Sequence, residues 1–265
     1  MEHLPAKNQT CEYCGAALNP AYYFCAVCAT PFQAVDRLLP EERPAWESSE
    51  TLLRKRVPQA MRVFWSFAIA LLLGAIISFS MFGKEESLGG YVVSSIMVFL
   101  TTCVLSVLYW ESLKVQLGRF GFNHSAAWMG LALLPLALMI NYGYHHLILH
   151  NLMDDASALD QFKEIFPIRW TAVLILCILP AITEEIAFRG LVQHWMHAAL
   201  PDGKAILMAS ALFSALHLNL ISAPYLFALG ALLGYTRWKT GSLYPAMLIH
   251  FLHNFVVLTY FPSVS

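Results

Sequence analysis

The sequence has few charged residues, and this scarcity excludes an ordinary soluble domain. Only 12% of its 265 residues are charged, whereas 58% are hydrophobic, a balance outside the range of soluble globular chains. A basic excess is also lacking, because the formal net charge is −1, and this excludes a generally basic nucleic-acid binder. The first sixty residues contain no apolar signal-peptide core, so we expect an internal helix to direct membrane insertion.

Two common catalytic signatures are missing as well. There is no GxSxG turn, so Ser214 lacks the setting of a covalent serine nucleophile. There is no HExxH helix, so the sequence does not require the zinc chemistry of that motif. Cysteine is scarce beyond residue 28, where Cys103 and Cys177 each lie alone in an apolar run and are expected to act as small hydrophobic residues.

Apolar segments of membrane-spanning length are abundant. Val63–Phe82 and Tyr91–Trp110 are each twenty residues without a charge, the length needed to cross about 30 Å of hydrocarbon. Further apolar segments lie at about 126–149, 170–192, 204–220, 224–238 and 243–261. We therefore predict an all-α polytopic membrane protein, with a bundle of about seven transmembrane helices over residues 62–265 and a bend at Pro180.

Basic residues near the ends of these segments predict the orientation. Arg54, Lys55, Arg56 and Arg62 precede the first span, and positive charge favours the cytoplasmic side. The acidic 150–164 loop then falls on the opposite side, and Lys204, Arg237 and Lys239 return to the first. We expect an integral protein of a bacterial inner membrane with a cytoplasmic N-terminus.

Four cysteines close to the N-terminus predict a metal site. Residues 1–30 contain two CxxC pairs, Cys11 with Cys14 and Cys25 with Cys28, which can present four thiolates to one structural Zn²⁺, as in zinc ribbons. Disulfides are the alternative, although a reducing cytosol disfavours them. Residues 31–61 are rich in proline and charge and are predicted to be a linker. The ribbon could dock a protein partner.

An acidic pair lies inside the apolar run at 170–192. Glu185 and Arg189 are four residues apart, so they share one helical face and can form an ion pair. Glu184 points about 100° away and has no local partner. Ionisable groups at membrane depth cost roughly 2.5 to 3.5 kcal/mol each on insertion scales. This cost indicates a functional site, with a purely structural salt bridge as the alternative for Glu185 and Arg189.

Two further polar pairs occur at helical spacing in the last apolar segments. Phe213 and His217 are one turn apart, as are His250 and Asn254. Each helix must satisfy its own polar groups, so we expect all three clusters to meet in one cavity. His253 could join them, whereas His194 and His197 are expected at the membrane interface.

Peptide-bond hydrolysis is the chemistry that these groups favour. Glu184 and a histidine can activate water, while a second imidazole and an amide hold the oxyanion. The same groups could instead coordinate a catalytic Zn²⁺. The sequence leaves this choice open.

The ordered motifs resemble one family. Glu184-Glu185-x3-Arg189, Phe213-x3-His217 and His250-x3-Asn254 are similar to the motifs of the CAAX-protease and bacteriocin-processing (CPBP, or Abi) intramembrane proteases, over about residues 130–261. The resemblance implies that Glu184 and His217 activate water and that His250 and Asn254 stabilise the oxyanion, or serve as ligands if a metal is used. Glu185, Arg189 and Phe213 would support them. We favour the metal-free version.

Two other functions remain open. The bundle could be a catalytically silent scaffold or immunity protein that binds a partner, or a proton-coupled transporter, because buried Glu and His also form proton relays. The predicted substrate of the protease is a membrane-inserted or lipid-modified peptide, and no nucleic acid is expected as a partner.

Metal analysis tests the ribbon. The full-length protein should contain about one zinc, all of it bound by the four thiolates, whereas a shortened protein that begins near residue 58 should contain none and still hydrolyse peptide. Stoichiometric zinc in the shortened protein, lost on His250→Ala, would favour the metal-dependent mechanism instead.

Overall fold

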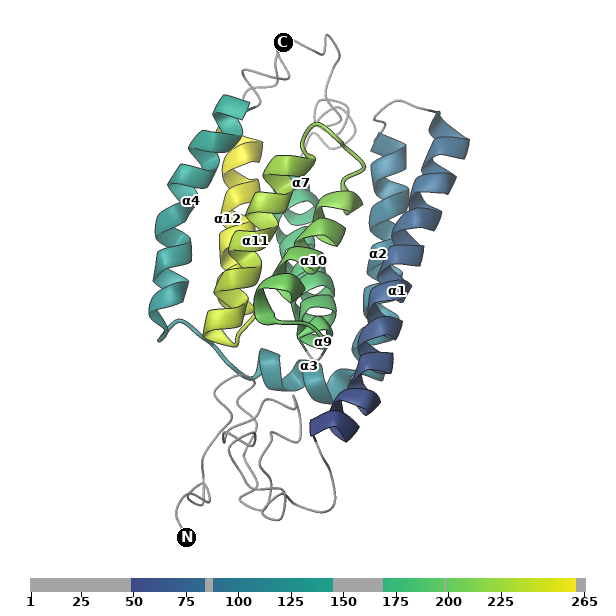
Figure 1. Cartoon of the computed structure of the whole chain (residues 1–265). Helices are drawn as coiled ribbons and strands as arrows, with labels where there is room; N and C mark the ends of the chain where they lie inside the picture. Colours follow the sequence, from purple (N-terminus) through teal and green to yellow (C-terminus); the bar gives the residue numbers. More distant parts are fainter. Residues whose placement is uncertain (1–48, 84–87, 145–168, 198, 261–265) are drawn as a thin grey trace, which may run out of the picture.

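The computed structural model describes residues 49–83, 88–144, 169–197 and 199–260, and the regular elements within these ranges are helices (Figure 1). The predicted zinc ribbon and its four cysteines lie outside the described residues. The end of the predicted linker differs from expectation, because the first helix begins at Ser49 and continues through Pro58.

The helices reproduce the apolar segments of the sequence. They are α1 (Ser49–Phe82), α2 (Leu88–Leu108), α3 (Trp110–Leu117), α4 (Ser125–Tyr144), α10 (Asp202–Leu216), α11 (Ala223–Thr240) and α12 (Tyr244–Tyr260). Between α4 and α10 lies one long helix of five consecutive parts, which we call the motif helix: α7 (Arg169–Val173), η4 (Leu174–Ile178), α8 (Leu179–Glu184), η5 (Glu185–Gln193) and α9 (His194–Met196). The parts η4 and η5 are π-helical.

Each of the seven predicted segments forms a helix within the described residues, but three of these helices, rather than the seven predicted, are long and apolar enough to cross a membrane on their own. These are Val57–Phe82, Ser125–Tyr144 and Trp170–Met196. A fourth span results if α2 and α3, which meet at 97°, are counted together. Helix α12 is apolar but shorter. The protein is therefore an all-α integral membrane protein.

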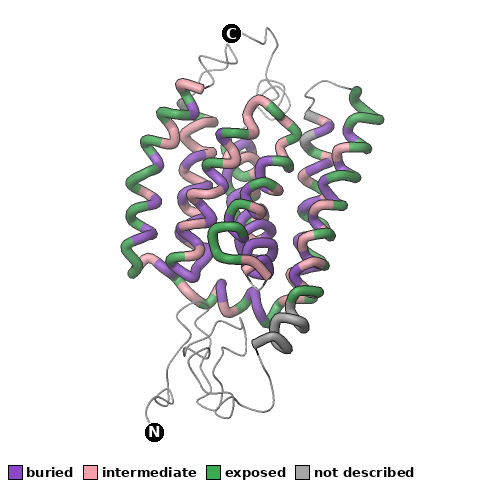
Figure 2. Tube along the Cα trace, in the orientation of Figure 1, coloured by how far each residue is buried: buried purple, intermediate pink, exposed green. Residues whose placement is uncertain are grey.

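Exposed residues lie along the outward faces of the outer helices (Figure 2), and many of them are large and apolar. Leu72 on α1, Val107 on α2 and Met139 on α4 are all more than half exposed. Apolar patches of this extent are unusual on soluble monomers. They match a surface that contacts lipid.

The first two helices pack directly against the motif helix. A continuous core joins Val63, Phe67 and Val98 to Phe188 and Leu191. The Phe67 and Phe188 ring centroids are 6.0 Å apart. Helices α1 and α2 thus help to fix the position of the motif helix, which carries the acidic pair.

Helix α3 turns inward because its polar side chains bond to the bundle. The Nε2 of Gln116 donates to the carbonyl of Gly190 at 3.0 Å, and its Oε1 accepts from Arg237 at 2.6 Å. The Ser112 hydroxyl lies 2.7 Å from Nε2 of His194. The side chain of His194 is buried within the protein and takes part in this network, and its expected position at the membrane interface stays a prediction.

The turn that follows α3 is packed against the start of α12. Gly121 has a φ of +75°, and a Cβ added there would lie 2.5 Å from the Cβ of Ser242. Ser242 is buried and its hydroxyl donates to the carbonyl of Arg119 at 2.5 Å. This contact sets the position of the helix that carries His250.

We predict that Gly121→Ala destabilises the protein more than Gly83→Ala. Both glycines have positive φ, but an added Cβ at Gly83 meets nothing within 4 Å. Both alanine variants therefore carry the same strain of a positive φ, and the clash at Gly121 should lower the free energy of unfolding by a further ~1–3 kcal/mol. Thermal unfolding in one detergent measures both variants, and equal shifts in melting temperature would contradict the packing described.

Candidate active site

The acidic pair lies where the motif helix changes its winding. Glu184 ends α8, and Glu185 begins the π-helical part η5. Departures from α-helical winding of this kind are rare and are frequently found at functional sites. The two carboxylates, adjacent in sequence, point to different sides of the helix, and both are buried.

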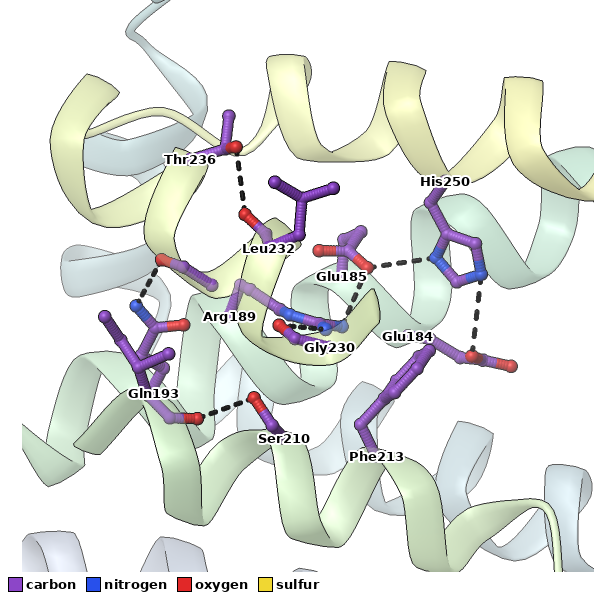
Figure 3. Close-up of polar contacts among 12 residues, drawn as sticks. Glu184, Glu185, Arg189, Gln193, Ser210, Phe213, Gly230, Leu232, Thr236 and His250 are labelled. Atoms are coloured by element: carbon purple, nitrogen blue, oxygen red, sulfur yellow. Dashed lines mark hydrogen bonds and ion pairs between the residues drawn. The ribbon is translucent and has the colours of Figure 1, made fainter. Parts of the chain in front are cut away.

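The predicted ion pair between Glu185 and Arg189 is present and fully buried (Figure 3). Nη1 of Arg189 donates to Oε1 of Glu185 at 2.8 Å, and Nη2 donates to the carbonyl of Gly230 at 3.0 Å. The guanidinium carbon lies 4.4 Å from the centroid of the Phe213 ring. Each partner thus offsets the cost of burying the other.

Gly230 and Gly234 on α11 let the backbone approach closely. A Cβ at Gly230 would lie 3.1 Å from Ser210, and one at Gly234 would lie 2.8 Å from Oε1 of Gln193. Small residues at this spacing are typical of close helix packing in membranes, but the spacing does not reveal Gln193. Its Nε2 donates to the carbonyl of Gly234 at 2.9 Å, one turn from the bond that Arg189 makes.

His250 connects the two carboxylates. Its Nδ1 lies 2.9 Å from Oε1 of Glu185, and its Nε2 lies 4.0 Å from Oε2 of Glu184. Because an ionised carboxylate only accepts hydrogen bonds, the proton on Nδ1 points to Glu185. The Nε2 atom therefore faces Glu184, and a proton can be held between the two.

The Glu184 carboxylate has spare acceptor capacity. Its side chain is buried, and its Oε2 has no hydrogen-bond donor among the described residues. Buried polar atoms without a partner are rare in proteins and need an explanation. A bound water or a substrate group would supply the missing donor.

Phe213 and His217 bring two further rings to the site from the C-terminal end of α10. The Phe213 ring centroid is 5.3 Å from that of His217 and 5.6 Å from that of His250. Helix α10 ends at Leu216, and His217 is the next residue. Leu218, which follows His217, has a φ of 52°. Nδ1 of His217 donates to the carbonyl of Phe213 at 3.1 Å, so the lone pair of the neutral ring is on Nε2.

Asn254 lies one turn beyond His250 on α12. Its Nδ2 donates to the carbonyl of Leu176 at 3.1 Å, and its Oδ1 lies 3.0 Å from Nδ1 of the neighbouring His253. The amide is thus held against the motif helix. This contact had no signal in the spacing of the motifs, because Leu176 contributes only its backbone.

The donor set does not form an obvious metal site. Within the described ranges, no group of three or more His, Cys, Asp or Glu side chains is arranged to hold a metal ion. Glu184 and His250 approach each other, but the third protein ligand that a catalytic zinc normally has is not in place. We therefore derive no catalytic step through a metal.

Comparison with known proteins identifies the segment that contains these residues. Residues 166–256 match the sequence model of the family described as Rce1-like, type II CAAX prenyl endopeptidase. The match agrees with the resemblance seen in the motifs. Neither the curated proteins nor the solved structures yielded a match.

The effect of burial on an ion pair can be measured by comparing the buried pair of Glu185 and Arg189 with the exposed pair of Glu111 and Lys114. We predict that Arg189→Met lowers the free energy of unfolding by about 3–5 kcal/mol, because it leaves Glu185 buried without its cation. Lys114→Met removes the exposed partner of Glu111 and should cost no more than about 1 kcal/mol. Denaturation in detergent compares the two, and similar losses would show that the buried pair is not essential to the fold.

Proposed function

We propose that the chain is an intramembrane endopeptidase, because residues 166–256 match the sequence model of the family described as Rce1-like, type II CAAX prenyl endopeptidase. The observation that carries the proposal is the buried Glu184 carboxylate, which has an oxygen without a donor and lies 4.0 Å from Nε2 of His250. A carboxylate and an imidazole that face each other in a site closed to bulk solvent are suited to proton transfer.

Glu184 acts as the general base in this proposal. It accepts a proton from a water molecule, and the water oxygen attacks the carbonyl carbon of the scissile peptide bond. His217 orients the water through Nε2, the ring nitrogen that carries the lone pair. Apo sites are often looser than reacting complexes, so the 4.0 Å separation between Glu184 and His250 is compatible with this role.

His250 and Asn254 stabilise the negative charge that develops on the carbonyl oxygen. Glu185 accepts the Nδ1 proton of His250, and when the ring is doubly protonated Nε2 carries a proton as well and can donate it to the oxyanion. Asn254 has a second N–H beyond the one that bonds Leu176, and an amide has two such donors. Donors held in place before the reaction are worth about 10²–10³ in kcat each.

Collapse of the tetrahedral intermediate completes the reaction. The carbon–nitrogen bond breaks, and the electron pair stays on the leaving nitrogen. The proton held by Glu184 passes to that nitrogen, which leaves as an amine, while the other product is a carboxylic acid that loses its proton to the amine. The base thereby returns to its ionised form, and no covalent enzyme intermediate is needed.

The substrate is a membrane-associated peptide. The site is formed by helices of an integral membrane protein, and the family name specifies prenylated CAAX tails as the substrates of its members. We propose a lipid-modified peptide whose acyl or prenyl chain lies among the lipid-facing helices. The N-terminal ribbon, with Zn²⁺ on its four cysteines, would lie in the cytoplasm and could dock a protein partner.

Glu184→Gln tests the mechanism. The change keeps the size of the side chain but removes its basicity, so kcat for a prenylated peptide should fall at least about 100-fold. Glu111→Gln is the matched control, because that glutamate is exposed on α3, and its activity should equal that of the wild type. Wild-type turnover by Glu184→Gln would rule out the base, and a partner that binds both proteins equally without cleavage would favour the scaffold function.

A further inference from the structure

Pro180 leaves a backbone carbonyl in the motif helix without its usual partner. Proline has no N–H, so residue 180 donates to no carbonyl of the preceding turn, and with α-helical winding that carbonyl would be the one of Leu176. The amide of Asn254 from α12 supplies a donor to this carbonyl at 3.1 Å. The carbonyl of Leu176 in the motif helix thus requires a hydrogen-bond donor from α12, and the Asn254 amide is that donor.

This contact fixes which way the Asn254 amide points. A carbonyl oxygen accepts hydrogen bonds and cannot donate one, so Nδ2 of Asn254 must face Leu176. The other end of the amide, Oδ1, then faces Nδ1 of His253 at 3.0 Å. A reversed amide would place two acceptors against each other at Leu176.

The same logic fixes the tautomer of His253. Since Oδ1 of Asn254 only accepts, Nδ1 of His253 must carry a proton. In the neutral ring Nε2 is then an acceptor, and it lies 2.6 Å from the hydroxyl of Tyr225. The Tyr225 hydroxyl therefore donates, and the hydrogen bonds run in one direction from Tyr225 through His253 to Asn254.

Two of the three side chains in this series, Tyr225 and His253, are well packed. Tyr225 and His253 are both more than nine-tenths buried, and their rings stack with centroids 5.7 Å apart. Tyr225 also belongs to the apolar cluster with Leu229 and Ile249 that joins α11 to α12. Such packing restricts the rotation of the imidazole and of the amide that it holds.

We propose that Tyr225 and His253 are positioning residues that orient the Asn254 amide for oxyanion stabilisation. The inference rests on the function proposed above and goes beyond the motifs, which contain neither residue. With one N–H of Asn254 bonded to Leu176 and Oδ1 bonded to His253, the remaining N–H has a fixed direction. Held donors of this kind lower the reorganisation needed in the transition state.

Tyr225→Phe in two backgrounds tests the proposal. In the otherwise wild-type protein the change removes one hydroxyl, and kcat for a prenylated peptide should fall about tenfold with KM unchanged, as for other outer-shell hydrogen-bond partners. In the Asn254→Ala background the same change should alter kcat less than about twofold, because residues that act through one another are not additive. Tyr235→Phe, a tyrosine on the same helix, is the control.

The outcomes separate this inference from the proposed function. An equal fall in both backgrounds, or none in the first, would overturn the positioning role while Glu184→Gln still abolishes cleavage. Full activity of Glu184→Gln would instead overturn the proposed function. His253→Asn, which retains an amide N–H near the Nδ1 position, should lose less activity than His253→Leu.

The tautomer of His253 gives a readout that does not depend on activity. Nitrogen NMR of histidine-labelled protein in nanodiscs, with His253→Asn used for assignment, should show the proton on Nδ1. Tyr225→Phe should shift the Nε2 resonance. A proton on Nε2 of His253 in the wild type would contradict the direction of the hydrogen bonds and overturn the proposal.

Discussion

The buried ion pair of Glu185 and Arg189 is the interaction on which the rest of the site depends. Taking two charges out of water is costly, and the cost is offset only when each charge is bonded on several sides. Arg189 meets this need with Glu185, the carbonyl of Gly230 and the face of Phe213. Glu185 meets it in part, because Arg189 and His250 both bond its Oε1, whereas its Oε2 has no hydrogen-bond partner among the described residues. The pair therefore joins the motif helix to α10, α11 and α12 at one point.

Backbone carbonyls are the second means by which the bundle is held together. Side-chain amides from α3 and α12 bond to carbonyls of the motif helix at Gly190 and Leu176. In return, Arg189 and Gln193 bond to carbonyls of α11 at Gly230 and Gly234. Without water in the hydrocarbon region, such bonds have no competing partner except another protein group. The motif helix is thus fixed in rotation as well as in position.

Much of this arrangement could be predicted from residue spacing, because a helix brings residues four apart onto one face. The sequence placed Glu185 beside Arg189 and Phe213 beside His217, and it indicated that His250 would approach the acidic pair. The seven apolar segments all became helices. Spacing could not predict contacts between distant segments. The inward turn of α3 depends on Arg237, which lies 121 residues after Gln116, and the burial of His194 depends on the same arginine.

The sequence pattern also could not predict the π-helical winding of the motif helix. A bend was expected at Pro180, yet residues 170–196 form one continuous span, in which the residues just before Leu179 and Pro180 are π-helical. The consequence for Asn254 appears only when α12 is packed alongside. The four N-terminal cysteines lie outside the described residues, and their zinc site stays a prediction.

The most direct test of the account is a comparison of new protein C-termini in membranes that contain either the wild type or Glu184→Gln. If the buried carboxylate activates water for peptide hydrolysis, mass spectrometry should find a set of C-termini that is present with the wild type and missing with the variant at equal expression. The same set in both membranes would contradict the central claim that Glu184 is the base of an intramembrane endopeptidase.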